Sequence, residues 1–197
     1  MKHDIRVEGF LYEMRPIERE DAEFIAEVRT PERSAFLHPI TRTIEAQLAF
    51  LDRYFERPDD YYFVIQRKED SRKEGLAGLL DFDMGKRSAQ WGRLILRPGS
   101  LAAAETALMM LRIAFNRFAL TEVWGTVLPT NAPMVAYLKS LGFKHRSGLK
   151  MDFGDSLRDA DEYVLPASQW PALERKLIDI ARGVAGRTFK TPQGRTA

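Results

Sequence analysis

Hydrophobic residues along the chain recur with two different spacings, one typical of strands and one typical of helices. Phe10, Tyr12 and Met14 lie on one side of an extended segment, which is the spacing of a strand. Ile44 and Leu51 belong to a stripe that recurs every three or four residues, which predicts an amphipathic helix. Period-two and helical segments then follow one another along most of the chain.

The pattern predicts an ordered series of elements. Strands are expected over 9–17, 61–65, 75–83, 88–92, 94–96, 122–127, 144–151 and 162–165, with 75–83 and 88–92 as a central hairpin. Helices are expected over 17–29, 44–56, 101–118 and 171–182. Thr43 can cap the second of these, and the run Pro129-Thr130-Asn131 caps a further short helix that ends at Gly142. The charged segment 67–74 is expected as a hairpin loop, and 152–161 as an acidic loop.

This order indicates an α/β fold with one mixed central sheet and helices on both faces. The chain has 197 residues, of which 45% are hydrophobic, enough for one globular core. We expect a single domain over 1–183. Residues 184–197 contain glycine, proline and several basic residues, and are expected to form a disordered tail.

The turn after the strand at 94–96 has the features of an anion site. Proline and glycine in the run Arg97-Pro98-Gly99-Ser100 force a tight turn, and Ser100 can cap the helix that follows. The first turn of a helix exposes unpaired N–H groups at its positive end, and small residues allow a phosphate to approach. Candidate ligands are Arg97, Gly99, Ser100, Leu101, Ala102 and Ala103. An alanine-rich start is equally typical of a packing helix without a ligand.

Two stretches resemble the GNAT superfamily of acyl-CoA-dependent N-acetyltransferases. The run from Thr130-Asn131 to Leu141-Gly142-Phe143 resembles the closing motif of that family. The run Trp91-Gly92-Arg93-Leu94-Ile95-Leu96-Arg97-Pro98 resembles its fourth strand and pyrophosphate loop. The resemblance covers about 14–165. The ending Pro166-Ala167-Ser168-Gln169-Trp170 resembles the branch that acetylates amino sugars or ribosomal-protein N-termini.

The resemblance implies a co-substrate and a reaction. Acetyl-CoA would lay its pantetheine arm beside the backbone of Leu94, Ile95 and Leu96, where the family's fourth and fifth strands part. Its pyrophosphate would lie on 99–103, and Asn131 would contact the arm or order its helix. A primary amine on an amino sugar, a protein N-terminus or a small molecule would attack directly, because the chain has no cysteine to carry an acyl group.

Two departures from the family pattern keep an alternative open. Serine and alanines stand where the family's loop carries glycines, and Leu138 stands where the family often has a tyrosine, with Tyr137 beside it. Neighbouring helix residues point about 100° apart, so Tyr137 does not simply inherit that role. The alternative is a non-catalytic acyl-CoA-binding or regulatory module.

Candidate catalytic residues are Tyr137 and the carboxylates Asp81 and Asp83. An amine with a pKa near 10 must lose a proton before it attacks, and either carboxylate is able to relay that proton through water. The loop over 30–43 is long enough to cover a site. From the family's layout, Arg29, Phe36 and His38 are candidates for contacting the acceptor.

Composition narrows the partners. The net charge is +2, from 30 basic and 28 acidic residues. A nucleic-acid-binding surface needs clustered basic residues, and we see no such cluster, so we expect no nucleic-acid partner. Three scattered histidines and no cysteine give no metal-binding spacing. We find no apolar run of about 18 residues and no secretory signal, so we expect a cytoplasmic protein with no membrane contact, monomeric or homodimeric.

Overall fold

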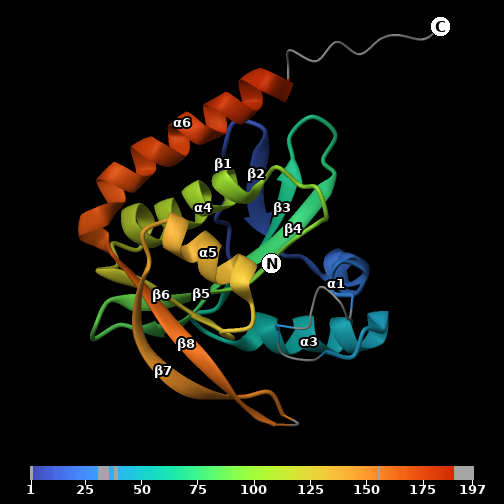
Figure 1. Cartoon of the computed structure of the whole chain (residues 1–197). Helices are drawn as coiled ribbons and strands as arrows, with labels where there is room; N and C mark the ends of the chain where they lie inside the picture. Colours follow the sequence, from blue (N-terminus) through green and yellow to red (C-terminus); the bar gives the residue numbers. More distant parts are fainter. Residues whose placement is uncertain (1, 31–35, 38–39, 155, 189–197) are drawn as a thin grey trace, which may run out of the picture.

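The computed structural model describes residues 2–30, 36–37, 40–154 and 156–188. These residues form one open mixed sheet with strand order β1-β2-β3-β4-β5-β6-β8-β7 (Figure 1). The strands are β1 Val7–Glu8, β2 Tyr12–Pro16, β3 Tyr61–Arg67, β4 Lys73–Asp83, β5 Ser88–Leu96, β6 Glu122–Val127, β7 Lys144–Asp152 and β8 Leu157–Pro166. The predicted α/β fold is therefore confirmed.

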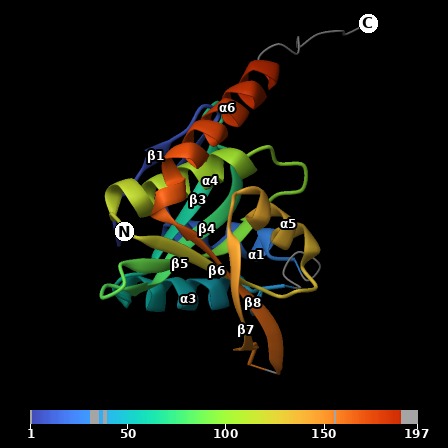
Figure 2. The ribbon, with the colours of Figure 1, turned by 60° about the vertical axis from the view of Figure 1, so that its left-hand side comes forward.

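Helices cover both faces of the sheet (Figure 2). On one face, α1 Ala22–Val28 and α3 Ile44–Glu56 pack over apolar side chains of β3, β4 and β5. On the other face lie α4 Ala103–Arg112, α5 Ala132–Ser140 and α6 Trp170–Thr188. Short turns of helix, η1 Arg19–Asp21, η2 Ile113–Arg117 and η3 Ala167–Gln169, extend α1, α4 and α6.

Several predicted boundaries are wrong: β4 begins at Lys73, inside the expected hairpin loop over 67–74, and two further differences concern β8 and α6. Residues 157–161 belong to β8 rather than to an acidic loop, because β7 and β8 form a long hairpin. The side chains of β7 are nearly all exposed, and Ala160 is the only buried residue in the stretch 157–161, so this part of the hairpin shows no apolar alternation in the sequence. Charged pairs link the two strands here, such as the Lys150 ammonium and the Asp159 carboxylate, 2.6 Å apart. Helix α6 continues to Thr188, so 184–188 are helical, and 189–197 lie outside the described residues.

The only parallel pair among the described strands separates along its length. Residues 88–90 of β5 pair with 122–124 of β6, and the pairing ends there. Both strands continue, β5 to Leu96 and β6 to Val127, without facing each other in a ladder. Each strand therefore keeps an edge of backbone N–H and C=O groups that a ligand can pair with.

A bulge re-directs β5 at this position. Leu76 of β4 pairs with Ile95 and Gly78 pairs with Gly92, so two β5 residues face Ala77 alone. One of the two, Arg93, has a φ of 55°, in the left-handed region that L-residues rarely occupy. The bulge turns the Arg93 side chain to the α1 and α3 side of the sheet, where it meets Tyr62 and Phe50.

Candidate active site

A cleft of about 330 Å³ lies where β5 and β6 part. Its walls are residues 91–94 of β5, residues 125–127 of β6, the side of α5 from Asn131 to Leu138, and the segment 36–37. Most of these side chains are apolar, and the parted strands supply polar backbone groups. A cleft with this lining suits a flexible arm that carries amide groups.

Trp91 forms the floor of the cleft at the point where the strands separate. Its side chain is 7% exposed, and its ring lies edge-on to Tyr137, with centroids 6.2 Å apart. The indole N–H is buried without a hydrogen-bond partner in the described part of the chain. Such a donor carries a cost unless a bound molecule accepts from it.

Asn131 begins α5, as the sequence predicts. Its side-chain oxygen accepts a hydrogen bond from the N–H of Met134, 3.3 Å away, and its own side chain borders the cleft. The predicted capping role is confirmed, and contact with a bound arm stays a prediction. A polar side chain at this helix start is positioned to reach an amide in the cleft.

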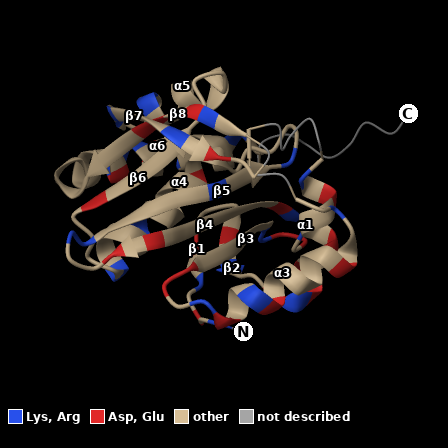
Figure 3. Cartoon of the chain, turned by 90° about the horizontal axis from the view of Figure 1, so that it is seen from below, with Lys and Arg blue, Asp and Glu red and all other residues tan. Residues whose placement is uncertain are grey.

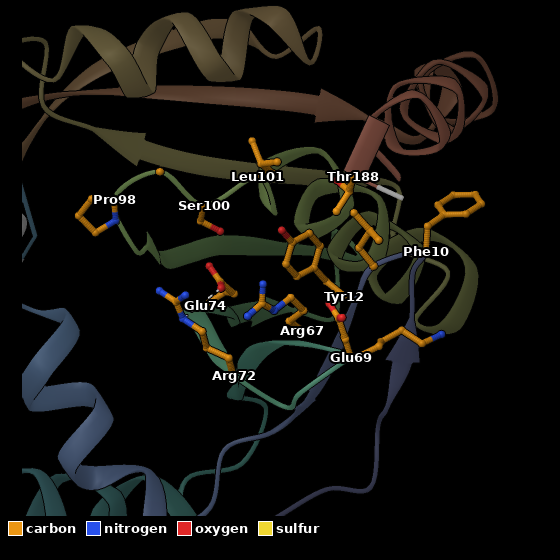
Figure 4. Close-up of a pocket in the computed structure, with 13 residues that line it drawn as sticks. Phe10, Tyr12, Arg67, Glu69, Arg72, Glu74, Pro98, Ser100, Leu101 and Thr188 are labelled. Atoms are coloured by element: carbon orange, nitrogen blue, oxygen red, sulfur yellow. Dashed lines mark ion pairs between the residues drawn. The ribbon is translucent and has the colours of Figure 1, made fainter. Parts of the chain in front are cut away.

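The predicted pyrophosphate loop lies beside the cleft but borders a different cavity. Gly99, Ser100 and Leu101 line a cavity of about 750 Å³ together with the β3–β4 hairpin (Figure 4). Tyr12 and Ser100 face this cavity from opposite sides in that view. Ion pairs, including one between Arg72 and Glu74 of 3.5 Å, border it. The loop therefore lines this cavity, and none of its residues from Arg97 to Leu101 lines the cleft.

Inside the loop, several predicted ligands are already engaged. Arg97 donates to both carboxylate oxygens of Glu27, at 2.6 and 2.8 Å, so its guanidinium faces α1. The hydroxyl of Ser100 accepts from the N–H of Ala102, which is fully buried, and α4 begins one residue later. Leu101 is 57% exposed. Anion contacts here would come from backbone N–H groups near Gly99 and from the first turn of α4.

The other predicted cofactor residues divide between the cleft and the core. Leu94 borders the cleft, whereas Ile95 points to the opposite side and is 7% exposed in the core under α1 and α3. Leu96 packs against the core under α4. Ala103 accepts a hydrogen bond through its carbonyl from the Tyr137 hydroxyl, at 2.9 Å. A ligand would meet the backbone of this strand rather than these side chains.

Tyr137 lies on the cleft-facing side of α5. Its hydroxyl donates to α4 at Ala103, and burial raises its pKa above that of ordinary tyrosine. The phenol therefore stays protonated across the pH range in which enzymes work. It is able to donate a proton, but only if the hydroxyl leaves the Ala103 carbonyl. Leu138 beside it is buried.

We expect Tyr137→Phe to separate two roles for this phenol. If the hydroxyl protonates a leaving thiolate, kcat should fall about 100-fold while the Kd for CoA stays unchanged. If the hydroxyl only joins α5 to α4, kcat should persist and the melting temperature should fall. Steady-state kinetics beside a thermal melt measures both. The loss of kcat is the expected result, and its absence would remove Tyr137 from the chemistry.

Asp81 and Asp83 lie together, but not with Tyr137. Both line a cavity at the β4–β5 turn with Arg146, Glu122 and Glu162. Asp83 accepts a hydrogen bond from the N–H of Lys86 in that turn, at 2.9 Å. Ser88 lines this cavity and Arg93 lines the cleft, and an extended strand between two such residues spans roughly 16 Å. A catalytic role for either carboxylate stays a prediction that requires a long water chain.

The two candidate acceptor residues that the structure describes, Phe36 and Arg29, line different cavities. Phe36 is at the rim of the cleft and is 37% exposed. Arg29 ends α1 and lines a neighbouring cavity. His38 lies outside the described residues. Sequence reasoning missed Arg93 and Trp91 as site residues; the glycine at position 92 inside an apolar strand was the signal for a bulge.

Surface charge in the described part of the chain is mixed. Basic and acidic residues are interspersed along α3 and the strands in the view of Figure 3. No group of three or more described His, Asp or Glu side chains is arranged to hold a metal. Across the described ranges, no helix is both long enough and apolar enough to span a membrane.

A family model described as "Acetyltransferase (GNAT) domain" matches residues 12–144, about two-thirds of the chain. The chain belongs to the GNAT acetyltransferase family, as its resemblance indicated. No curated protein sequence matches the chain significantly.

Solved structures share this fold. A GCN5-related N-acetyltransferase from Brucella melitensis is 20% identical, with a TM-score of 0.78 over 89% of this chain and 84% of that one. FdhC, described as a nucleotide-linked sugar GNAT, is 24% identical, with a TM-score of 0.74 over 91% and 98%. Spermidine N-acetyltransferase from Vibrio cholerae, solved with CoA and spermine, is 18% identical, with a TM-score of 0.72 over 82% and 99%. At these identities the likeness concerns the fold.

Proposed function

We propose that the protein transfers an acetyl group from acetyl-CoA to a primary amine. The parting of β5 from β6 over a cleft lined by apolar side chains is the observation that carries this proposal. The pantetheine arm would lie in the cleft and pair its amides with the free backbone edges. The pyrophosphate would lie on the N–H groups between Gly99 and the first turn of α4, whose positive end favours an anion.

The reaction is a direct displacement. The neutral amine nitrogen attacks the thioester carbonyl carbon and the C–N bond forms, which leaves the nitrogen positively charged. The C–S bond then breaks to release CoA as a thiolate that takes up one proton, and the nitrogen loses one proton to water, so the products are a neutral amide and the CoA thiol. A residue that protonates the sulfur regains its proton from the same water. The amine must lose its own proton first, because an alkylammonium has a pKa near 10. The described residues that line the cleft include no carboxylate, so we propose that this proton leaves through water in the open cleft. Tyr137 is the proposed donor to sulfur.

A non-catalytic acyl-CoA-binding module is the second candidate. Two observations favour it. The Tyr137 hydroxyl is hydrogen-bonded to the Ala103 carbonyl, and Leu138 occupies the position where the family often has a tyrosine. Such a module would bind CoA and acetyl-CoA alike and release no thiol in the presence of amines. The specific branch, acting on amino sugars or protein N-termini, and a cytoplasmic location stay proposals.

Calorimetric titration of the full chain with acetyl-CoA and with CoA tests the proposal first. We expect dissociation constants on the order of micromolar for both. Thiol release in the presence of primary amines then distinguishes an enzyme from a binding module. An absence of heat with both ligands would refute the proposed function while leaving the fold untouched.

A further inference from the structure

Arg93 and Asp60 form a buried ion pair beside the cleft. Both terminal nitrogens of the Arg93 guanidinium donate to the Asp60 carboxylate, one of them at 2.8 Å. Asp60 is buried, and the Arg93 side chain is 16% exposed. The guanidinium also lies over the rings of Tyr62 and Phe50, 4.9 and 5.9 Å from their centroids. Burial alone would lower the pKa of Arg93, but the Asp60 carboxylate outweighs burial and raises it, so the guanidinium stays protonated.

This ion pair spans three neighbouring strands of the sheet. Arg93 belongs to β5, and Asp60 immediately precedes Tyr61, the first residue of β3. Between these strands lies β4. The Arg93 side chain crosses β4 at Gly78, where an added Cβ atom would lie 3.5 Å from the Arg93 Cδ atom. The pair therefore joins the bulged residue of β5 to the start of β3.

The backbone at Arg93 is strained in the position that the pair holds. Its φ of 55° lies in the left-handed region, which costs an L-residue about as much free energy as a tenfold change in an equilibrium constant. Such a conformation persists only where the surrounding contacts outweigh its cost. Removing one partner of a buried ion pair costs more than this strain, so the pair is strong enough to hold the bulge.

The bulge decides where the wall of the cleft lies. Residues two apart on a strand share a face, so an unbulged β5 would place Arg93 on the same side as Trp91. Trp91 packs there against Tyr137 in an apolar environment, where an unpaired guanidinium would be costly. With the bulge, the guanidinium lies with Tyr62 on the opposite side, and the backbone of 91–94 forms the wall of the cleft.

We infer that Arg93 and Asp60 are positioning residues for acetyl-CoA: their ion pair fixes the bulge and so holds the β5 backbone edge where the pantetheine arm binds. This inference rests on the proposed function and adds two residues to it. An edge that is fixed before binding spares the ligand the free energy of ordering it. Loss of the pair should therefore weaken binding even where no contact with the ligand is removed.

Three variants test the inference by calorimetric titration of the full chain with acetyl-CoA. Asp60→Asn removes the negative charge, and Arg93→Ala removes the cation but keeps a strained L-residue; each should raise the Kd at least about tenfold. Arg93→Gly also removes the cation, but glycine adopts this φ without strain, so the Kd should rise about threefold at most. Wild-type affinity in Asp60→Asn, or a loss in Arg93→Gly that equals or exceeds that in Arg93→Ala, would overturn the inference.

A truncated ligand and a second buried carboxylate supply the controls. S-acetylpantetheine carries the arm without the nucleotide end, so Asp60→Asn should weaken its binding by the same factor as that of acetyl-CoA. Asp21→Asn also alters a buried carboxylate that accepts two hydrogen bonds from one arginine, so it should lower the melting temperature without changing either Kd. A loss confined to acetyl-CoA, or an equal loss in Asp21→Asn, would contradict the inference.

Hydrogen exchange without ligand separates this inference from the proposed function. Peptides that cover 88–96 should exchange faster in Asp60→Asn than in Asp21→Asn, at a temperature where both variants are folded, because the bulge is no longer fixed. Equal exchange would overturn the inference. A wild-type chain that binds neither ligand would refute the proposed function, whereas faster exchange in Asp60→Asn would still show that the pair holds the β5 edge.

Discussion

Replacing Leu101 by glutamate should weaken CoA binding about 30-fold. Leu101 is 57% exposed on the loop before α4, so a polar side chain there costs little in folding. In the proposed complex the new carboxylate lies near the pyrophosphate. Two like charges about 8 Å apart repel by about 2 kcal/mol at an effective dielectric constant of about 20. That energy corresponds to roughly 30-fold in Kd.

The controls for this variant separate charge from shape. Leu101→Gln has nearly the same shape without charge and should bind CoA like the wild type. Leu157→Glu adds the same charge at another exposed leucine, 68% exposed at the start of β8, and should also bind normally. The next residue, Ala102, is unsuitable for the same substitution because its side chain is fully buried. Calorimetry with CoA measures all three variants.

Two further measurements test whether the repulsion comes from the pyrophosphate: the affinity for a truncated ligand and the affinity for CoA at high salt. S-acetylpantetheine lacks the pyrophosphate, so its affinity should be the same for Leu101→Glu and the wild type. The loss with CoA should shrink at high salt, because the screening length falls from about 8 Å at physiological ionic strength to about 3 Å at 1 M. If Leu101→Glu and Leu101→Gln bind CoA equally, the pyrophosphate lies elsewhere.

Local signals in the sequence predicted part of this site. Thr43 and Asn131 were expected to cap helices, and each side chain accepts the N–H three residues ahead. Such caps depend on a few neighbouring residues, so a single sequence reveals them. The Ser100 prediction was close: its hydroxyl accepts from Ala102, and α4 begins at Ala103.

Long-range contacts placed the rest of the site. Arg97 looked available for an anion, but Glu27, 70 positions away, holds it against α1. Arg93 was expected as an ordinary strand residue, and its direction depends on a bulge opposite β4 and on Asp60. These partners are set by the packing of α1 and α3 on the sheet, which periodicity alone does not reveal. The directions of the Arg97 and Arg93 side chains therefore could not be predicted from the sequence.

Replacing Asp21 by alanine should lower the free energy of unfolding by about 3–5 kcal/mol, because it leaves the buried guanidinium of Arg15 without its carboxylate. Asp21 is 1% exposed. Its carboxylate accepts from both terminal nitrogens of Arg15, at 2.7 and 2.8 Å, and lies 2.6 Å from the ammonium of Lys73. The N–H of Glu18 also donates to it, at 2.8 Å. Urea denaturation measures the loss, with Asp179→Ala on the exposed side of α6, which should unfold like the wild type, as the control.

The same carboxylate should make stability depend on pH. Burial alone would raise the pKa of Asp21, but the hydrogen bonds from Arg15, Lys73 and Glu18 outweigh burial and lower it. A folded-state pKa below the unfolded value contributes stability that is fully present above about pH 4 and is lost as pH falls through the folded value. Asp21→Asn should lack this part of the acid-induced loss. Identical acid profiles for this variant and the wild type would contradict the assignment.

The ion pairs of Asp21 with Arg15 and Lys73 also hold the helix that ends at Arg29, a candidate for contacting the acceptor. They tie β2, through Arg15, and β4, through Lys73, to the start of α1. Only the Arg97–Glu27 pair makes a comparable bidentate link from the sheet to α1 among the described residues. Because Arg29 is the residue at which α1 ends, loosening the helix should displace its guanidinium. We therefore expect Asp21→Asn, at a temperature where it is still folded, to raise KM for the amine acceptor while the Kd for CoA stays constant.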